Sequence, residues 1–304
     1  MLSRIFQGAV LLAFVTLDSG AAVPEQVASN LYRLGTDADT AFVVTTAEGN
    51  ILINSGSSEA SNAALKPSTI RAQMAVLGLR FEDIKLLLAS HAHADHVGGH
   101  ALIRRLTGAT VSIMDGDQRA LRTGLANDYG ISVKITEPCP VDEVLQDRAQ
   151  VRLGGVTLTA YRTAGHTAGA TTWALRVDRE GRAQDLLLLD STMQYRGRDF
   201  FAEEYPNRLR DYADGLRVLR ELPADLAFDP HGGELRSRAD IMQWLEAKSA
   251  QLRQEAAEQL RIQLDPVAWR VARQRASDDY QRMLTAPEAR LAYPELQLSP
   301  ELHR

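Results

Sequence analysis

Short apolar runs, each bounded by glycine or polar residues, recur along most of the chain. Runs of this length and composition are typical of strands that are buried in a sheet. A turn over residues 48–50 joins the second and third of them as a hairpin. The strands predicted in this way are Leu31–Leu34, Ala41–Thr46, Ile51–Ile53, Ile84–Ala89, Ala109–Ile113, Val151–Leu153, Val156–Tyr161, Thr171–Val177, Leu186–Leu189 and Leu226–Phe228.

Apolar residues at helical spacing predict helices between and after these strands. In the segment Ser57–Leu79, Pro67 interrupts the pattern, so we expect the helix to start near Ser68 and to stop at Gly78. The pair Asp265 and Pro266 is typical of a helix start, with the acid as N-cap and the proline in the first helical position. The other predicted helices are Ala101–Leu106, Asp117–Ala126, Arg208–Glu221, Arg238–Leu264 and Val267–Leu284.

The composition is that of an ordinary globular protein. The 304 residues, of which 45% are hydrophobic and 24% are charged, are enough to bury one large core. The net charge of -5 offers no basic surface, which argues against nucleic acid as a partner. The single cysteine, Cys139, excludes an intrachain disulfide, so stability must come from the core.

The first residues of the chain predict an export signal. One positive charge, Arg4, precedes an apolar run, and small residues follow the run. This order is typical of a secretory signal peptide, here cleaved near Ala21 or Ala22. Asp18 ends the apolar run too early for a membrane anchor. We therefore expect residues 1–22 to be removed and the mature protein to be periplasmic, with no membrane anchor.

Most of the candidate chemistry lies in one loop, Ser90–His100. It contains four of the seven histidines and one acid, and it lies between the predicted strand Ile84–Ala89 and a predicted helix. Active sites usually lie on such loops. Imidazole and carboxylate are ligands that zinc prefers, and the pattern H-x-H-x-D-H supplies enough of them for parts of two adjacent metal sites.

Further histidines occur on loops that match this one. His166 lies in a Gly-His-Thr loop between two predicted strands, and His231 follows the last predicted strand. Each half of the chain thus runs from strands to a loop that carries histidine. Two similar halves of this kind are what a two-sheet sandwich would show.

These motifs together resemble the metallo-β-lactamase superfamily. The resemblance implies an α/β fold, a four-layer αββα sandwich with two zinc ions bound at one edge of its sheets. It also implies which residues hold the metals: a first zinc is assigned to His91, His93 and His166, and a second to Asp95, His96 and His231. His100 and His303 match no ligand position.

The resemblance further implies a hydrolytic mechanism. Zinc lowers the pKa of a bound water to about 7, so a hydroxide is present at neutral pH. Held between the two metals and hydrogen-bonded to Asp95, that hydroxide would attack a carbonyl carbon. A zinc-binding or scaffold protein without activity would lack some of the ligands, whereas all six are present.

Within the superfamily, the chain is most similar to the subclass B3 metallo-β-lactamases. Those enzymes place a histidine directly after the aspartate, as His96 follows Asp95, and a serine, here Ser191, where other subclasses have a cysteine ligand. Further similarity runs through residues 205–212 and 219–225. The resemblance implies hydrolysis of the β-lactam amide bond of a small antibiotic, with Asp95 and Ser191 as catalytic residues.

A second interpretation uses the same metals for another reaction. In lactonases and in thioesterases of the glyoxalase II type, an aspartate bridges both zinc ions, and Asp190 is one residue from that role. Four positions also depart from the B3 pattern, and Ala168 and Ala170 stand where a proline and a serine often flank the Gly-His-Thr loop. Asn54 replaces an acid that supports the metal loop, and Met193 replaces a second serine that helps to bind the substrate.

The predicted organisation has three parts. Residues 1–22 form the signal peptide, residues 23–237 the catalytic domain, and residues 238–304 a helical C-terminal extension. We expect the extension to pack on the catalytic domain, and a helical hairpin used for dimerisation is the alternative. Residues 131–147 are rich in turn formers and are expected to cover one edge of the site.

Overall fold

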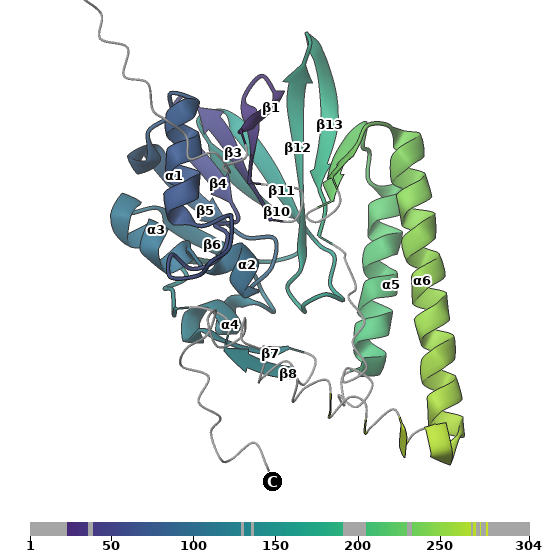
Figure 1. Cartoon of the computed structure of the whole chain (residues 1–304). Helices are drawn as coiled ribbons and strands as arrows, with labels where there is room; N and C mark the ends of the chain where they lie inside the picture. The colour runs from purple at the N-terminus through teal and green to yellow at the C-terminus, as the bar shows by residue number, and fades with distance from the viewer. Residues whose placement is uncertain are drawn as a thin grey trace, which may run out of the picture.

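Two β-sheets face each other at the centre of the molecule, and helices cover the outer face of each (Figure 1). Figure 1 shows the computed structural model of the chain. The structure describes residues 23–35, 39–128, 131–134, 137–190, 205–229 and 233–268, together with the isolated positions 270, 271, 274 and 278.

The first sheet is antiparallel in its N-terminal half and parallel beyond β4. Its strands, in spatial order, are β1 (Glu25–Ala28), β2 (Leu31–Gly35), β3 (Thr40–Thr46), β4 (Gly49–Ile53), β5 (Ile84–Leu88), β6 (Thr110–Met114) and β9 (Glu143–Leu145). Parallel neighbours need crossover connections. Helices α1 (Pro67–Val76) and α3 (His100–Thr107) supply them between β4, β5 and β6, so the carboxyl ends of these strands meet at one edge.

The second sheet is antiparallel except for the pair β13 and β14. Its strands, in spatial order, are β10 (Ala149–Leu153), β11 (Val156–Arg162), β12 (Thr171–Arg179), β13 (Arg182–Leu188), β14 (Leu226–Asp229) and β15 (Gly233–Leu235). Helix α5 (Tyr205–Glu221) lies between β13 and β14 in the chain, and α6 (Arg238–Leu264) follows β15.

Three apolar clusters separate four layers. One lies between the first sheet and its helices and includes Ile70, Met74 and Ile103, and one lies between the two sheets and includes Trp173. The third lies between the second sheet and α5 and α6, and includes Leu216. Helix on sheet on sheet on helix is the predicted αββα sandwich, which is thereby confirmed.

The predicted elements differ from the observed ones mainly between residues 117 and 147. The predicted helix Asp117–Ala126 is shorter, because α4 (Gln118–Thr123) ends at Gly124, whose φ of 71° lies in the left-handed region. Residues 125–134 form a hairpin of β7 (Leu125–Asp128) and β8 (Ile131–Lys134). The turn-rich segment also contains β9, which pairs with β6 at the edge of the first sheet. Strands β1 and β15 were not predicted.

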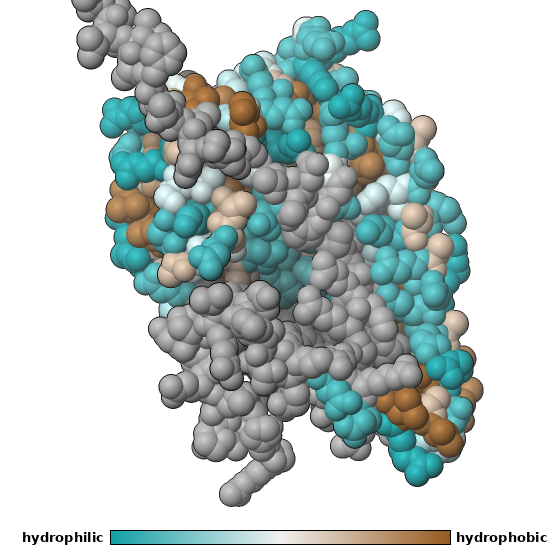
Figure 2. All heavy atoms as spheres, viewed as in Figure 1, coloured by the Kyte–Doolittle hydropathy of each residue, from teal (hydrophilic) through white to brown (hydrophobic). Residues whose placement is uncertain are grey.

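Helix α6 packs on the third cluster near its start and exposes apolar side chains at its far end. Ile241 and Leu245 are buried in the third cluster, whereas Leu260 and Leu264 are 56% and 75% exposed. Figure 2 shows apolar residues at this far end of α6. Asp265 then accepts hydrogen bonds from the backbone N–H groups of residues 267 and 268, as predicted for a helix start.

Two predicted segments cannot be placed. The signal peptide, residues 1–22, and most of the predicted helix Val267–Leu284 lie outside the described residues. In the part of the chain that is described, no helix combines the length and the apolar composition needed to cross a membrane.

Candidate metal centre

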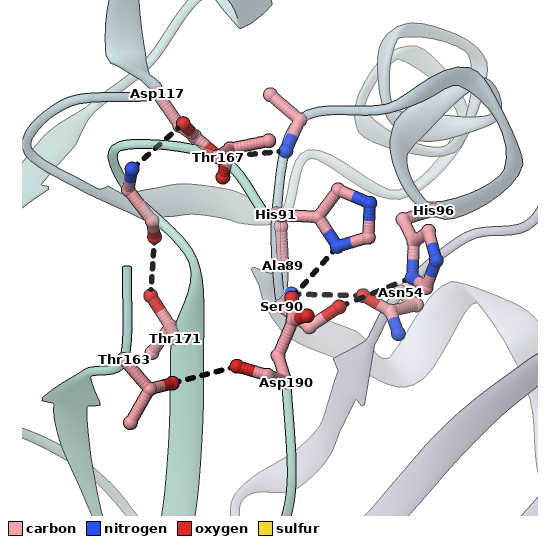
Figure 3. A network of polar contacts seen from close by, with 12 residues as sticks. Asn54, Ala89, Ser90, His91, His96, Asp117, Thr163, Thr167, Thr171 and Asp190 are labelled. Atoms are coloured by element: carbon pink, nitrogen blue, oxygen red, sulfur yellow. Dashed lines mark hydrogen bonds and ion pairs between the residues drawn. The ribbon is translucent and has the colours of Figure 1, made fainter. Parts of the chain in front are cut away.

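The histidine loop follows β5 at the edge where the parallel strands end, and the second sheet holds its backbone. The carbonyl of Ala89 accepts a hydrogen bond from Nε1–H of Trp173 at 3.0 Å, and the carbonyl of Ser90 accepts one from the N–H of Thr171 at 2.7 Å. Both donors lie on β12. The loop therefore begins at a fixed place between the two sheets (Figure 3).

His91, His93 and His166 form one group of possible metal ligands, with their ligand atoms all within 4.8 Å of one another. Their ring centroids are 4.4 to 4.7 Å apart, and the rings meet at 79° to 89°. Burial lowers the pKa of His93 to about 4, and burial also lowers the pKa of His166 well below its usual value. Neutral imidazoles at His93 and His166 suit a divalent metal, because each offers a lone pair without competition from a proton.

A second group shares His91 and adds Asp95 and His96. Asp95 and His96 lie on the short helix α2 (Ala94–Val97), with Oδ2 of Asp95 3.4 Å from Nε2 of His96. Burial would lower the pKa of His96, but the carboxylate of Asp95 raises it above the usual value. Burial would likewise raise the pKa of Asp95, yet His96, His91 and His93 hold it far below its usual range.

Asp190, two residues after β13, contacts His91, which belongs to both ligand groups. Its Oδ2 lies 2.7 Å from Nδ1 of His91, and both side chains are buried. The hydroxyl of Thr163 donates to the carbonyl of Asp190 at 2.7 Å, and the N–H of Asp190 donates to Oγ1 of Thr172 at 3.1 Å. With Nδ1–H directed at this carboxylate, His91 presents the lone pair of Nε2 to a metal. Asp190 belongs to neither ligand group.

Asp117 is a buried acid that the sequence analysis placed at a helix start and gave no role. It follows β6 at the sheet edge where the metal loop lies, and it accepts hydrogen bonds from that loop and from the His166 loop. Burial raises the pKa of its carboxyl to about 6 although these donors act to lower it. Its position directly after a parallel strand was the one signal in the sequence that could have indicated its role.

Asn54 supports the loop from the other side. Its Oδ1 accepts a hydrogen bond from the N–H of Ser90 at 2.9 Å, and Oγ of Ser90 lies 3.1 Å from Nδ1 of His96. Its φ of 66° lies in the left-handed region, which asparagine tolerates better than most residues. Nδ2 of Asn54 donates to the carbonyl of Thr40 at 3.4 Å, so this position uses an amide donor that an acid lacks.

The remaining candidate residues lie apart from the two groups or outside the described residues. His100 is buried, with Nδ1 2.7 Å from Oγ of Ser55, and burial lowers its pKa to about 3. It belongs to neither ligand group. Ser191, Met193, His231 and His303 lie outside the described residues.

The model of the metallo-β-lactamase superfamily matches residues 34–231. This chain belongs to that superfamily. The match covers most strands of both sheets and every residue of the two ligand groups. The superfamily supports a metal-dependent hydrolase, and the histidine groups are the place where its metal would bind.

Several solved structures similar to this chain are subclass B3 enzymes, as the resemblance implied. A point mutant of the FEZ-1 metallo-β-lactamase from Legionella gormanii is 30% identical with a TM-score of 0.68, covering 79% of this chain and 97% of that one. The class B3 di-zinc metallo-β-lactamase LRA-12, from an Alaskan soil metagenome, is 25% identical with a TM-score of 0.68. It covers 77% of this chain and 94% of that chain.

A curated relative carries a different activity in its name. Hydroxyacylglutathione hydrolase of Anaeromyxobacter dehalogenans is 29% identical over 135 residues, which are 44% of this chain and 43% of that protein. The chain thus spans less than half of this relative. Membership of the superfamily is common to both comparisons, whereas the reaction differs between them.

Proposed function

We propose that this protein is a zinc-dependent β-lactamase that opens the β-lactam amide bond. The observation that carries the proposal is the structural similarity to enzymes named metallo-β-lactamases. The FEZ-1 mutant superposes over 79% of this chain and 97% of its own, at 30% identity and a TM-score of 0.68. Because one fold can host several reactions, the substrate has to be decided by assay.

The resemblance assigns one zinc ion to each of two sets of three ligands. His91, His93 and His166 would hold a first zinc, and Asp95, His96 and His231 a second. Bound zinc supplies a Lewis acid that polarises a carbonyl and makes water acidic enough to react at neutral pH. Asp95 stays ionised across the physiological range and can accept a hydrogen bond from the attacking water, which orients it. Ser191 would contact the substrate carboxylate.

A thioesterase or lactonase is the second candidate, and the curated relative favours it. That chemistry needs Asp190 as a ligand between two metals. In this structure Oδ2 of Asp190 lies 2.7 Å from Nδ1 of His91, and Asp190 belongs to neither group of possible ligands among the described residues. A carboxylate in this place can orient His91 as a ligand, which supports the β-lactamase proposal.

The test is an assay of purified mature protein on five substrates: a penicillin, a cephalosporin, a carbapenem, an acyl-homoserine lactone and a glutathione thioester. We expect hydrolysis of the β-lactams that a chelator abolishes and added zinc restores. Turnover of the thioester or the lactone with a higher kcat/KM than any β-lactam would reject the proposal in favour of the second candidate. A His166→Ala variant serves as the control for contaminating activity.

Export of the protein is proposed on the sequence of residues 1–22. Arg4, the apolar run after it and the small residues near Ala22 support a cleaved signal peptide. Fractionation of cells that express the full chain should place the mature protein in the periplasm, with its N-terminus close to Ala22. An intact N-terminus on cytoplasmic protein would contradict this proposal.

A further inference from the structure

One buried carboxylate joins the two loops that carry the trihistidine group. Oδ2 of Asp117 accepts a hydrogen bond from the N–H of Ala92 at 2.8 Å and another from the hydroxyl of Thr167 at 2.9 Å. Oδ1 of Asp117 accepts a third from the N–H of Gly169 at 3.0 Å. Figure 3 shows this carboxylate between the loops that bear its partners.

The partners of Asp117 are the immediate neighbours of the ligands. Ala92 stands between His91 and His93, and Thr167 directly follows His166. The carboxylate of Asp117 therefore fixes the backbone on both sides of the point where the three imidazoles meet. None of its hydrogen bonds goes to an imidazole, so it acts on the ligands only through the backbone and the side chain of Thr167.

Glycines let the loops approach this carboxylate closely. A Cβ on Gly169 would lie 2.6 Å from the carboxyl carbon of Asp117, and a Cβ on Gly116 would lie 2.7 Å from the backbone of Ala168. Gly116 also has a φ of 108°, which a residue with a side chain rarely adopts. Glycine at positions 116 and 169 therefore allows the His166 loop to lie directly against Asp117 and its neighbour.

The other flank of the His166 loop rests on α5. Nε–H of Arg208 donates to the carbonyl of Gly165 at 2.6 Å. A Cβ on Gly165 would lie 2.5 Å from the Cβ of Tyr212, so the loop backbone packs directly on the helix. The His166 loop is thus held by α5 and by Asp117. These contacts set the position of His166 relative to the second sheet and to the metal loop.

We infer that Asp117 is a positioning residue that sets the separation of the His91–His93 and His166 loops, and with it the geometry of the metal that they bind. All three groups directed at it are donors, so an acceptor-only carboxylate fits there. An amide at this position would place an N–H₂ group against at least one of them. The inference concerns metal binding and does not depend on which substrate the protein hydrolyses.

The experiment compares Asp117→Asn with the wild type in the full mature protein, using cobalt(II) as a metal with a visible spectrum. We expect about 10–100-fold weaker cobalt binding, the range found when an outer partner of a ligand is lost. At saturating cobalt the ligand-field bands should also shift, because the imidazoles meet at altered angles. The melting temperature of the metal-free protein is measured beside both.

Asp142→Asn is the matched control. Asp142 also accepts a backbone N–H, that of Val111 at 2.9 Å, but its other partner is Arg104 and it touches neither loop. This variant should lose some stability and keep the cobalt affinity and spectrum of the wild type. If Asp117→Asn behaves in the same way, with a lower melting temperature and an unchanged spectrum and affinity, the inference is wrong.

A second pair of variants covers the case in which Asp117→Asn does not fold. Thr167→Val removes one of the three donors and leaves both backbone hydrogen bonds, whereas Thr167→Ser keeps the hydroxyl. Weaker cobalt binding in Thr167→Val with recovery in Thr167→Ser supports the inference. Equal affinity and equal spectra in both variants reject it.

Discussion

The two ligand groups of the metal centre share His91 but are assembled in different ways. In the trihistidine group, His166 comes from the second sheet and must be brought to the metal loop by contacts between distant segments. In the other group, the described members Asp95 and His96 lie on one turn of α2 and face each other through local geometry. His166 is thus placed by contacts with Asp117 and α5, whereas the helix that carries both Asp95 and His96 places them relative to each other.

The pKa values of the histidines also differ between the two groups. The trihistidine group lacks an acid among its members, so burial dominates and the pKa values of His93 and His166 fall. The group on α2 contains Asp95, which raises the pKa of His96. Burial thus favours the neutral form of His93 and His166, whereas Asp95 favours the protonated form of His96.

The largest effect is expected from removing His166, the ligand that lies on a loop of the second sheet. Loss of an outer partner costs about 10–100-fold in metal affinity or activity, so loss of a direct ligand should cost more. We expect His166→Ala to lower kcat/KM by more than about 100-fold, with loss of one metal equivalent in metal analysis. His100→Gln, at a buried histidine outside both groups, is the control. Equal losses in the two variants would contradict the assignment of His166.

Asp190→Asn comes next in size. Because Asp190 orients His91 through a 2.7 Å contact, we expect zinc affinity to fall by about 10–100-fold while zinc still binds at saturation. Asp185→Asn, at a half-buried acid on β13 that pairs with Arg176, is the control. Complete loss of zinc from Asp190→Asn at any concentration would identify Asp190 as a direct ligand and favour the thioesterase alternative.

The two groups should lose their metals at different pH values. Protonated imidazole does not bind metal, so protons compete with the metal for each histidine, and metal is lost as the pH falls. The pKa of His93 is about 4 and that of His96 is raised above its usual value, so the group on α2 should release its metal at the higher pH. Metal content measured after dialysis at a series of pH values should fall in two steps. A single step would contradict the difference between the groups.

The smallest effect is expected at Asn54, where the sequence suggested weakened support of the metal loop. The amide keeps the hydrogen bond to the N–H of Ser90 and also donates to the carbonyl of Thr40. We therefore expect Asn54→Asp to change zinc affinity by less than about tenfold, below the range for loss of an outer partner. An isothermal titration that shows a tighter site by more than this would mean that the missing charge matters.

Local patterns in the sequence were enough for the elements that build the sandwich and for the residues that could bind metal. The apolar runs predicted the strands β2 to β6 and β10 to β14, and Pro67 placed the start of α1 correctly. The H-x-H-x-D-H motif and His166 supplied candidate ligands, and five of these residues lie in the two groups of possible ligands that the described residues form. Their assignment to two zinc ions stays a prediction, and His231 lies outside the described residues. Strand periodicity and ligand chemistry are properties of neighbouring residues, so they can be recognised without the fold.

The tertiary structure alone decided which acids surround the metal centre. Asp190 and His91 are 99 positions apart, and Asp117 is 25 positions from Ala92 and 50 from Thr167. In the sequence, only the position of Asp117 shortly after a predicted strand marks it, and its hydrogen-bond partners cannot be read from that position. Its role arises because parallel strands of one sheet end at the same edge and because the second sheet brings the His166 loop against that edge.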